Sequence, residues 1–219
     1  MADAPTDNTE LIAKLKTDAT AIKRFQRLLT DGGQLLSGTK LTERIIFDFN
    51  KEVSSIPGGK GGTTRISNIE SFPILIGSGI SMTRASLGPC GVVIPHVHPR
   101  ATEYFLLVDG EVDFGYMLEL GLLGPAVPNP VIEGKLNANQ GTVFPQGSIH
   151  FQINNSPDCK PANIMVTLGS EDPGTTPIVQ MPSGGNATAT DPDDVRAILP
   201  PQLASVVTTC LARCYPDKA

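Results

Sequence analysis

The histidines carry the clearest chemical signal in this chain, because its 219 residues contain only three of them. His96 and His98 form a His-x-His pair, Glu103 follows closely, and His150 lies further along. Neutral imidazole is a common metal ligand, and residues i and i+2 of a strand point to the same face. We therefore expect His96, His98, Glu103 and His150 to hold one metal ion from neighbouring strands.

The alternative is that these are ordinary histidines, either buried and hydrogen-bonded or simply exposed. The i, i+2 spacing, the nearby carboxylate and the lack of further histidines favour the metal. Three imidazoles and one carboxylate leave an octahedral ion with open positions, whereas a purely structural site is closed. Such ligands suit most first-row transition metals, so the ligand set by itself does not select one.

The elements that position these residues are predicted from periodicity. Apolar residues recur at helical spacing over residues 9–30, and Gly32-Gly33 ends that helix. From residue 39 onward the pattern becomes short apolar runs broken by glycine and proline, with a hairpin turn at Asp109-Gly110. Helices are expected again from Asp191 and over 201–213. We predict strands at 45–49, 63–69, 72–76, 80–87, 92–98, 104–108, 111–117, 131–136, 142–144, 150–154, 163–168 and 178–180.

Two motifs around the predicted ligands resemble the paired signatures of the cupin superfamily, and specifically germin-like and spherulin-like proteins of the fungal type. The run His-Pro-Arg-Ala-Thr-Glu at 98–103 is particularly characteristic of germins. The resemblance covers roughly residues 41–181. The first motif contains Gly91, His96, His98, Glu103 and Gly110, and the second contains Gly141, Pro145, Gly147, His150 and Asn154.

This resemblance implies an all-β fold, the cupin jelly-roll β-barrel, with an N-terminal helix and C-terminal helices. We expect a single cupin domain over 1–219, divided into a helical arm at 1–40, the barrel at 41–182 and a helical extension at 183–219. Similar helices clamp the subunits of germins, so a homo-oligomer is expected. The resemblance also implies manganese as the first choice of ion, with iron, copper and zinc as alternatives.

The same resemblance implies which residues border the ion. Germins that oxidise oxalate carry two asparagines beside the metal, and this chain has Thr83 and Val93 there. Oxalate is a dianion that needs polar partners, so oxalate oxidation is disfavoured and an apolar organic substrate fits better. Several of these side chains could equally be plain barrel core. The candidate substrate pocket comprises Thr83, Val93, Phe105, Phe144, Phe151, Gln152 and Asn154.

Three functions follow as hypotheses. The leading one is a metal-dependent oxidoreductase that acts on superoxide or a small organic molecule at an open metal position. A second is a metal-dependent cupin without redox chemistry, such as a lyase, isomerase or cyclase that uses the ion as a Lewis acid. A third is a secreted structural or storage protein whose ion stabilises the barrel. No histidine remains for a Ser-His-Asp triad.

The four cysteines allow disulfides, with free structural thiols as the alternative. Cys90 and Cys159 flank the two predicted histidine strands, so a bridge between them is sterically feasible. Cys210 and Cys214 share one face of the predicted last helix, where a bridge within the helix is awkward and would form more readily at the helix end. A second metal site at Cys210 and Cys214 would need further ligands.

The charge, the hydropathy and the first residues of the chain limit which partners and which cellular compartment we expect. The net charge of −5 argues against nucleic acid, and no run of about twenty apolar residues predicts a membrane span. The chain starts without the apolar stretch of a secretory signal, which leaves a cytosolic protein or a secreted one whose signal is absent here. The germin resemblance favours export, and Asn186 is then the better of two glycosylation candidates.

Overall fold

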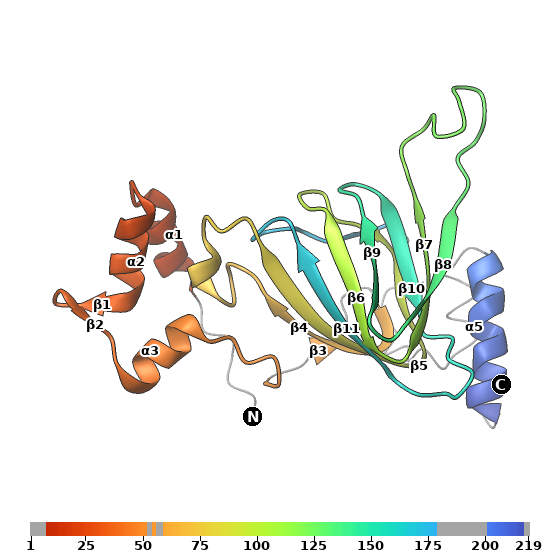
Figure 1. Ribbon diagram of the computed structural model, residues 1–219, viewed down its shortest axis with the longest axis horizontal. Helices are drawn as coiled ribbons and strands as arrows, with labels where there is room; N and C mark the ends of the chain where they lie inside the picture. Colours follow the sequence, from red (N-terminus) through yellow and green to blue (C-terminus); the bar gives the residue numbers. More distant parts are fainter. Residues whose placement is uncertain (1–7, 52–53, 56–58, 179–200, 217–219) are drawn as a thin grey trace.

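The computed structural model describes residues 8–51, 54–55, 59–178 and 201–216. An antiparallel β-barrel forms its centre, with short N-terminal helices at one end and helix α5 (Pro201–Cys214) at the other (Figure 1). The predicted all-β class is thereby confirmed, as is the helix predicted at 201–213. Asn186 and the helix predicted from Asp191 lie outside the described residues.

The barrel strands pair in the order β8-β7-β10-β5-β11-β6-β9, and β8 returns close to β6 and β9, so the barrel is nearly closed. Strands β4 and β12 pair with β5, and β3 pairs with β4. Alternation places every second residue inside, as in β6, where Glu103, Phe105 and Leu107 are buried. The strands are β3 (Ser54–Ser55), β4 (Gly59–Ser67), β5 (Ser81–Val97), β6 (Glu103–Asp109), β7 (Glu111–Met117), β8 (Ile132–Asn137), β9 (Gln140–Phe144), β10 (Ile149–Ile153), β11 (Ala162–Leu168) and β12 (Thr176–Pro177).

Strand β5 joins the two halves of the barrel, where the sequence predicted two separate strands. Its first half pairs with β11 and its second half with β10. The strand bends between these halves, because Cys90 has a φ of +60° and the register with β4 shifts there. A side chain on Gly91 would place its Cβ 2.6 Å from the carbonyl oxygen of Gly61. Glycine there permits the close approach of β4, so one continuous strand runs from the barrel core to the histidines.

Two apolar clusters hold these elements together. One fills the barrel, and the other lies between the outer face of β5 and β10 and helix α5. The first contains Ala85, Leu87, Ala101, Phe105, Leu107, Val112, Leu136, Phe144, Ala162, Ile164, Val166 and Leu168. The second contains Cys90, Val92, Ile94, Phe151, Ile153, Leu203, Ala204, Val207, Cys210 and Leu211.

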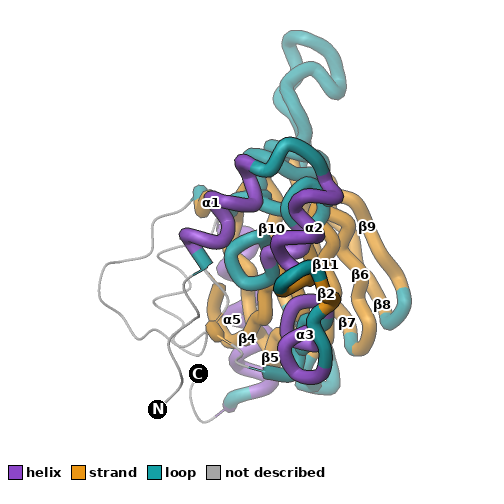
Figure 2. The backbone as a smooth tube through the Cα atoms, turned by 90° about the vertical axis from the view of Figure 1, so that its left-hand side faces the viewer, coloured by secondary structure: helices purple, strands orange, loops and turns teal. Residues whose placement is uncertain are grey.

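The N-terminal arm differs from its prediction, because the expected helix at 9–30 is two helices, α1 (Thr9–Thr17) and α2 (Ala21–Leu29). Thr20 adopts an extended conformation and its hydroxyl accepts from the backbone N–H of Lys23, which starts the second helix. A two-stranded ribbon of β1 (Thr30–Asp31) and β2 (Gln34–Leu35) follows, and Figure 2 shows the arm end-on.

Two further strands predicted in this region are wrong. The barrel was expected to begin at residue 41, which instead lies in helix α3 (Gly38–Ile45). The strand predicted at 45–49 is irregular after the helix ends. There, Phe47 packs on Phe49 and Phe72 by its side chain rather than joining a sheet. The strand predicted at 72–76 is the short 3₁₀ helix η1 (Pro73–Leu75), because proline lacks the N–H that a strand ladder uses.

Among the helices in the described residues, the longest is α5 with 14 residues. In the part of the chain that the structure describes, none is both long enough and apolar enough to cross a bilayer.

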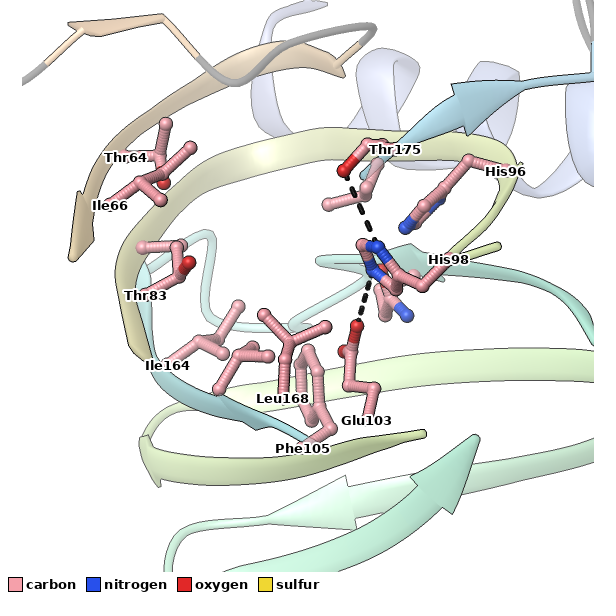
Figure 3. A pocket seen from close by; sticks show the side chains of 14 residues that line it. Thr64, Ile66, Thr83, His96, His98, Glu103, Phe105, Ile164, Leu168 and Thr175 are labelled. Atoms are coloured by element: carbon pink, nitrogen blue, oxygen red, sulfur yellow. Dashed lines mark hydrogen bonds and ion pairs between the residues drawn. The ribbon is translucent and has the colours of Figure 1, made fainter. Parts of the chain in front are cut away.

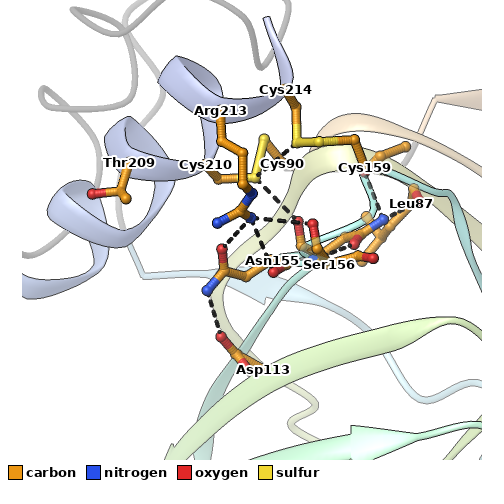
Figure 4. Close-up of a disulfide and its surroundings, with 12 residues drawn as sticks. Leu87, Cys90, Asp113, Asn155, Ser156, Cys159, Thr209, Cys210, Arg213 and Cys214 are labelled. Atoms are coloured by element: carbon orange, nitrogen blue, oxygen red, sulfur yellow. Dashed lines mark hydrogen bonds between the residues drawn. A yellow bond between two sulfur atoms is a disulfide. The ribbon is translucent and has the colours of Figure 1, made fainter.

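The disulfides connect α5 to the barrel, as Cys90–Cys210 and Cys159–Cys214 (Figure 4). The Cys90–Cys159 bridge, which the sequence allowed, is therefore wrong. Residues four apart share one helix face, so α5 presents both of its cysteines to the barrel and each meets a different partner. No thiol remains free, which also removes the cysteines as a second metal site.

A tryptic digest under non-reducing conditions tests this pairing, because cleavage after Arg213 separates Cys210 from Cys214. We expect mass spectrometry to find the peptide containing Cys90 joined to that containing Cys210, and Cys159 joined to Cys214. A peptide linking Cys90 to Cys159 would contradict the structure.

Candidate metal centre

The four predicted ligands converge at one place inside the barrel. Figure 3 shows three of them, His96, His98 and Glu103. His96 on β5 lies directly opposite His150 on β10, His98 follows the end of β5, and Glu103 begins β6. All four are buried, and their ligand atoms lie within 4.8 Å of one another. Residues from three strands thus form one compact donor set.

The orientation of each imidazole follows from its hydrogen bond to the backbone. The Nδ1 atom of His96 lies 2.8 Å from the carbonyl oxygen of Ile94, and that of His150 lies 2.9 Å from the oxygen of Ser148. The Nδ1 atom of His98 lies 2.5 Å from the oxygen of Gly174. A carbonyl can only accept, so each Nδ1 carries the hydrogen and each Nε2 is left to act as a ligand.

The inward-facing atoms fit a divalent cation. The Nε2 atom of His98 lies 2.8 Å from Oε2 of Glu103, and that of His150 lies 3.5 Å from the same oxygen. Within the described residues the buried Nε2 of His150 has no hydrogen-bond partner. Three nitrogen lone pairs facing one carboxylate repel each other unless a cation or a proton lies among them, so the donor set suits a divalent metal ion.

The electrostatics of the centre keep its carboxylate ionised. Burial and the neighbouring His150 lower the pKa of His96 to about 4, so this imidazole is neutral at physiological pH. Burial opposes the charging of His98, but the hydrogen bond and charge of Glu103 outweigh it and raise the pKa of His98. Burial likewise opposes ionisation of Glu103, yet the adjacent imidazoles of His150 and His98 lower its pKa to about 2.

A cavity of about 100 Å³ adjoins His96, His98 and Glu103. A single water needs roughly 10–15 Å³ on this measure, so the cavity has room for several waters or a small organic molecule. Apart from the three ligands, its wall consists of six aliphatic side chains, one phenylalanine, three threonines and one amide. The other lining residues are Thr64, Ile66, Thr83, Ala85, Val93, Phe105, Gln152, Ile164, Val166, Leu168 and Thr175.

Thr83, Val93, Phe105 and Gln152, which were predicted to border the substrate, are all among these lining residues. Phe144 lies behind the metal ligands instead, where its ring stacks on His150 at 4.5 Å between centroids.

Phe151 and Asn154 do not border the cavity, contrary to the prediction. Strand alternation turns Phe151 to the outer face of β10, where it packs in the cluster beneath α5. The side-chain amide of Asn154 donates to the carbonyl oxygens of Leu87, Gly88 and Lys160, so it holds the bend of β5.

Sequence reasoning missed much of the cavity wall. The alternation of Ile164, Val166 and Leu168 identified a strand, but not which space that strand faces. Thr64 and Ile66 on β4 have the same i, i+2 spacing, which also indicated a strand but not the space that it faces. Thr175 comes from a segment with no apolar pattern, so its place beside His98 follows only from the fold.

Comparisons with known proteins agree with this geometry. The cupin family model matches residues 52–196. Spherulin-1A of Physarum polycephalum is 34% identical over 75% of this chain and 58% of its own length. Germin-like protein 8-2 of Oryza sativa subsp. japonica is 35% identical over 60% of this chain and 56% of its own.

Among solved structures, a recombinant oxalate oxidase in complex with glycolate superposes with a TM-score of 0.55 at 24% identity. That match covers 80% of this chain and 82% of the other, and it supports the fold alone. The motifs, the barrel and the sequence relatives therefore agree, and the chain belongs to the cupin superfamily as a germin-like and spherulin-like protein.

Proposed function

We propose that this protein is a manganese-dependent oxidoreductase that acts on superoxide or a small organic molecule. The observation that carries the proposal is the convergence of three oriented Nε2 atoms and one ionised carboxylate beside a cavity. Burial of all four ligands excludes bulk water from most directions. The cavity provides the direction from which a substrate reaches the centre.

The protein's own residues have two tasks in this proposal. The histidines and Glu103 would hold the ion and fix its geometry, while the cavity wall would bind the substrate. A bound manganese ion would supply a redox couple and an open coordination position. The Nε2 of Gln152 is buried without a hydrogen-bond partner in the described part of the chain, so this amide can donate to a bound molecule.

The cavity wall supports a substrate other than oxalate. Thr83 and Val93 both line the cavity, and valine offers no hydrogen-bond donor to a carboxylate. Leaving either end of a dianion without partners in an aliphatic cavity is costly. Superoxide is smaller and needs only access to the ion, so it tolerates this wall.

The two disulfides support a site of action outside the cytosol, because such bridges persist in oxidising compartments. The germin-like relatives fit the same proposal.

Metal analysis and electron paramagnetic resonance on protein from the native host, followed by assays, test the function. We expect manganese, and we expect dismutation of superoxide or turnover of an organic substrate that a chelator abolishes and Mn²⁺ restores. Activity that survives demetallation would overturn the proposal. Turnover with redox-inert Zn²⁺ in the absence of oxygen would favour the lyase, isomerase or cyclase instead.

Replacing Glu103 with glutamine tests the ligand set while preserving the size of the side chain. We expect Glu103→Gln to weaken Mn²⁺ binding by more than about 100-fold, because even the loss of an outer partner costs roughly 10- to 100-fold. Isothermal titration of the metal-free chain measures this loss. The exposed Glu133→Gln on β8 is the matched control and should bind as the wild type does.

Acid should release the metal by protonating a histidine rather than by protonating Glu103. An imidazole must be neutral to bind, and the pKa of His98 lies above its ordinary value of 6.5. Affinity should therefore be complete above that raised pKa and fall by about tenfold per pH unit below it, for one displaced proton. Dialysis at pH 8 and pH 5 followed by metal analysis measures the change, and equal retention would contradict it.

A further inference from the structure

Residues 172–177, which we name the strap, cross the outside of the metal centre. The end of the strap is β12, where Thr176 pairs with Val97 and Pro177 with His96. Thr175 is exposed and also lines the cavity, so the strap lies at the mouth of the cavity, beside His98 (Figure 3). The hydroxyl of Thr175 lies 3.4 Å from Nδ1 of His98.

His98 depends on the strap in a way that the other two histidines do not. His96 and His150 each use a carbonyl two residues earlier in their own chain segment, so a correctly formed strand is enough to orient them. The Nδ1 of His98 instead meets Gly174, which is 76 residues away in sequence. The orientation of one ligand in four therefore depends on where the strap lies.

The strap is fixed at its start by Arg100, two residues after His98. The guanidinium donates twice to one residue, from Nε to the backbone oxygen of Asp172 at 2.6 Å and from Nη2 to its carboxylate at 2.9 Å. The backbone N–H of Arg100 donates to Pro173. Gly174 adopts a φ of +67°, and a Cβ there would lie 2.9 Å from the Arg100 guanidinium, so strap and arginine are closely packed.

We propose that Arg100 and Asp172 are positioning residues that hold the carbonyl of Gly174 against His98 and so fix the direction of its Nε2. Neither residue contacts the ion site itself. Their relevance to metal binding rests on the proposed function, whereas their effect on His98 is a property of the chain alone.

Because this ion pair is exposed, a variant that removes it tests the positioning of the strap with little effect on the stability of the fold. The side chains of Arg100 and Asp172 are 53% and 58% exposed, and exposed pairs contribute little to folding. Another arginine pair joins Arg27 to Asp18 in the N-terminal arm, away from the metal centre, where Nε and Nη2 donate to the two carboxylate oxygens. Its removal by Arg27→Gln is a matched control for the loss of a surface arginine.

The test uses the full chain labelled with ¹⁵N-histidine, in which only three imidazoles give signals. In the metal-free wild type we expect all three Nδ1–H protons to be protected from exchange with water. Arg100→Gln should accelerate exchange at His98 at least tenfold and leave His96 and His150 unchanged. Arg27→Gln should change none of them, and Asp172→Asn provides a second variant should Arg100→Gln fold poorly.

Titration with Mn²⁺ gives the second measurement. Arg100→Gln and Asp172→Asn should each weaken Mn²⁺ binding by roughly tenfold, as expected for the loss of an outer partner. Both should also alter the Mn²⁺ paramagnetic resonance spectrum. Unchanged exchange at His98 in both Arg100→Gln and Asp172→Asn would overturn the proposal. A wild type that binds no Mn²⁺ would overturn the proposed function, while the exchange measurement would still decide the role of the strap.

Discussion

The rest of this structure depends on the hydrogen bonds that three histidine Nδ1–H groups donate to backbone carbonyls. Once each of these hydrogens is donated outward, the three Nε2 lone pairs have to face inward. They surround the buried carboxylate of Glu103, whose pKa the neighbouring His150 and His98 lower to about 2, so it stays ionised. The backbone thereby creates a place that a metal ion or a proton neutralises.

Strand β5 connects this centre to everything else in the barrel. It contributes Thr83 and Val93 to the cavity wall, Cys90 to a bridge with α5, and His96 to the centre, and His98 follows directly after it. The amide of Asn154 holds its bend from the neighbouring strand. A disturbance at the bend would therefore reach the cavity, the disulfide and the ligands through one continuous segment.

The sequence predicted the centre and the barrel because both leave local marks: the i, i+2 histidines, the alternating strands and the turn at Asp109-Gly110. It failed where the answer depends on three-dimensional packing. The pairing of the cysteines depends on how α5 lies across the barrel, and Phe151 was misplaced because one step along a strand reverses the face. The break after Thr17 depends on a cap at Thr20 that competes with an otherwise continuous helical pattern.

His150 reaches His96 only through the pairing of β10 with β5, two segments far apart in sequence. The denatured chain therefore offers an ion little more than the local His96-His98 pair, whereas the native barrel offers the complete set. Anything that binds the native state better than the denatured one draws the folding equilibrium toward it by mass action. Binding of an ion by the proposed centre would then require the pairing of β10 with β5, and the metals in the compartment where the chain matures would decide which one it keeps.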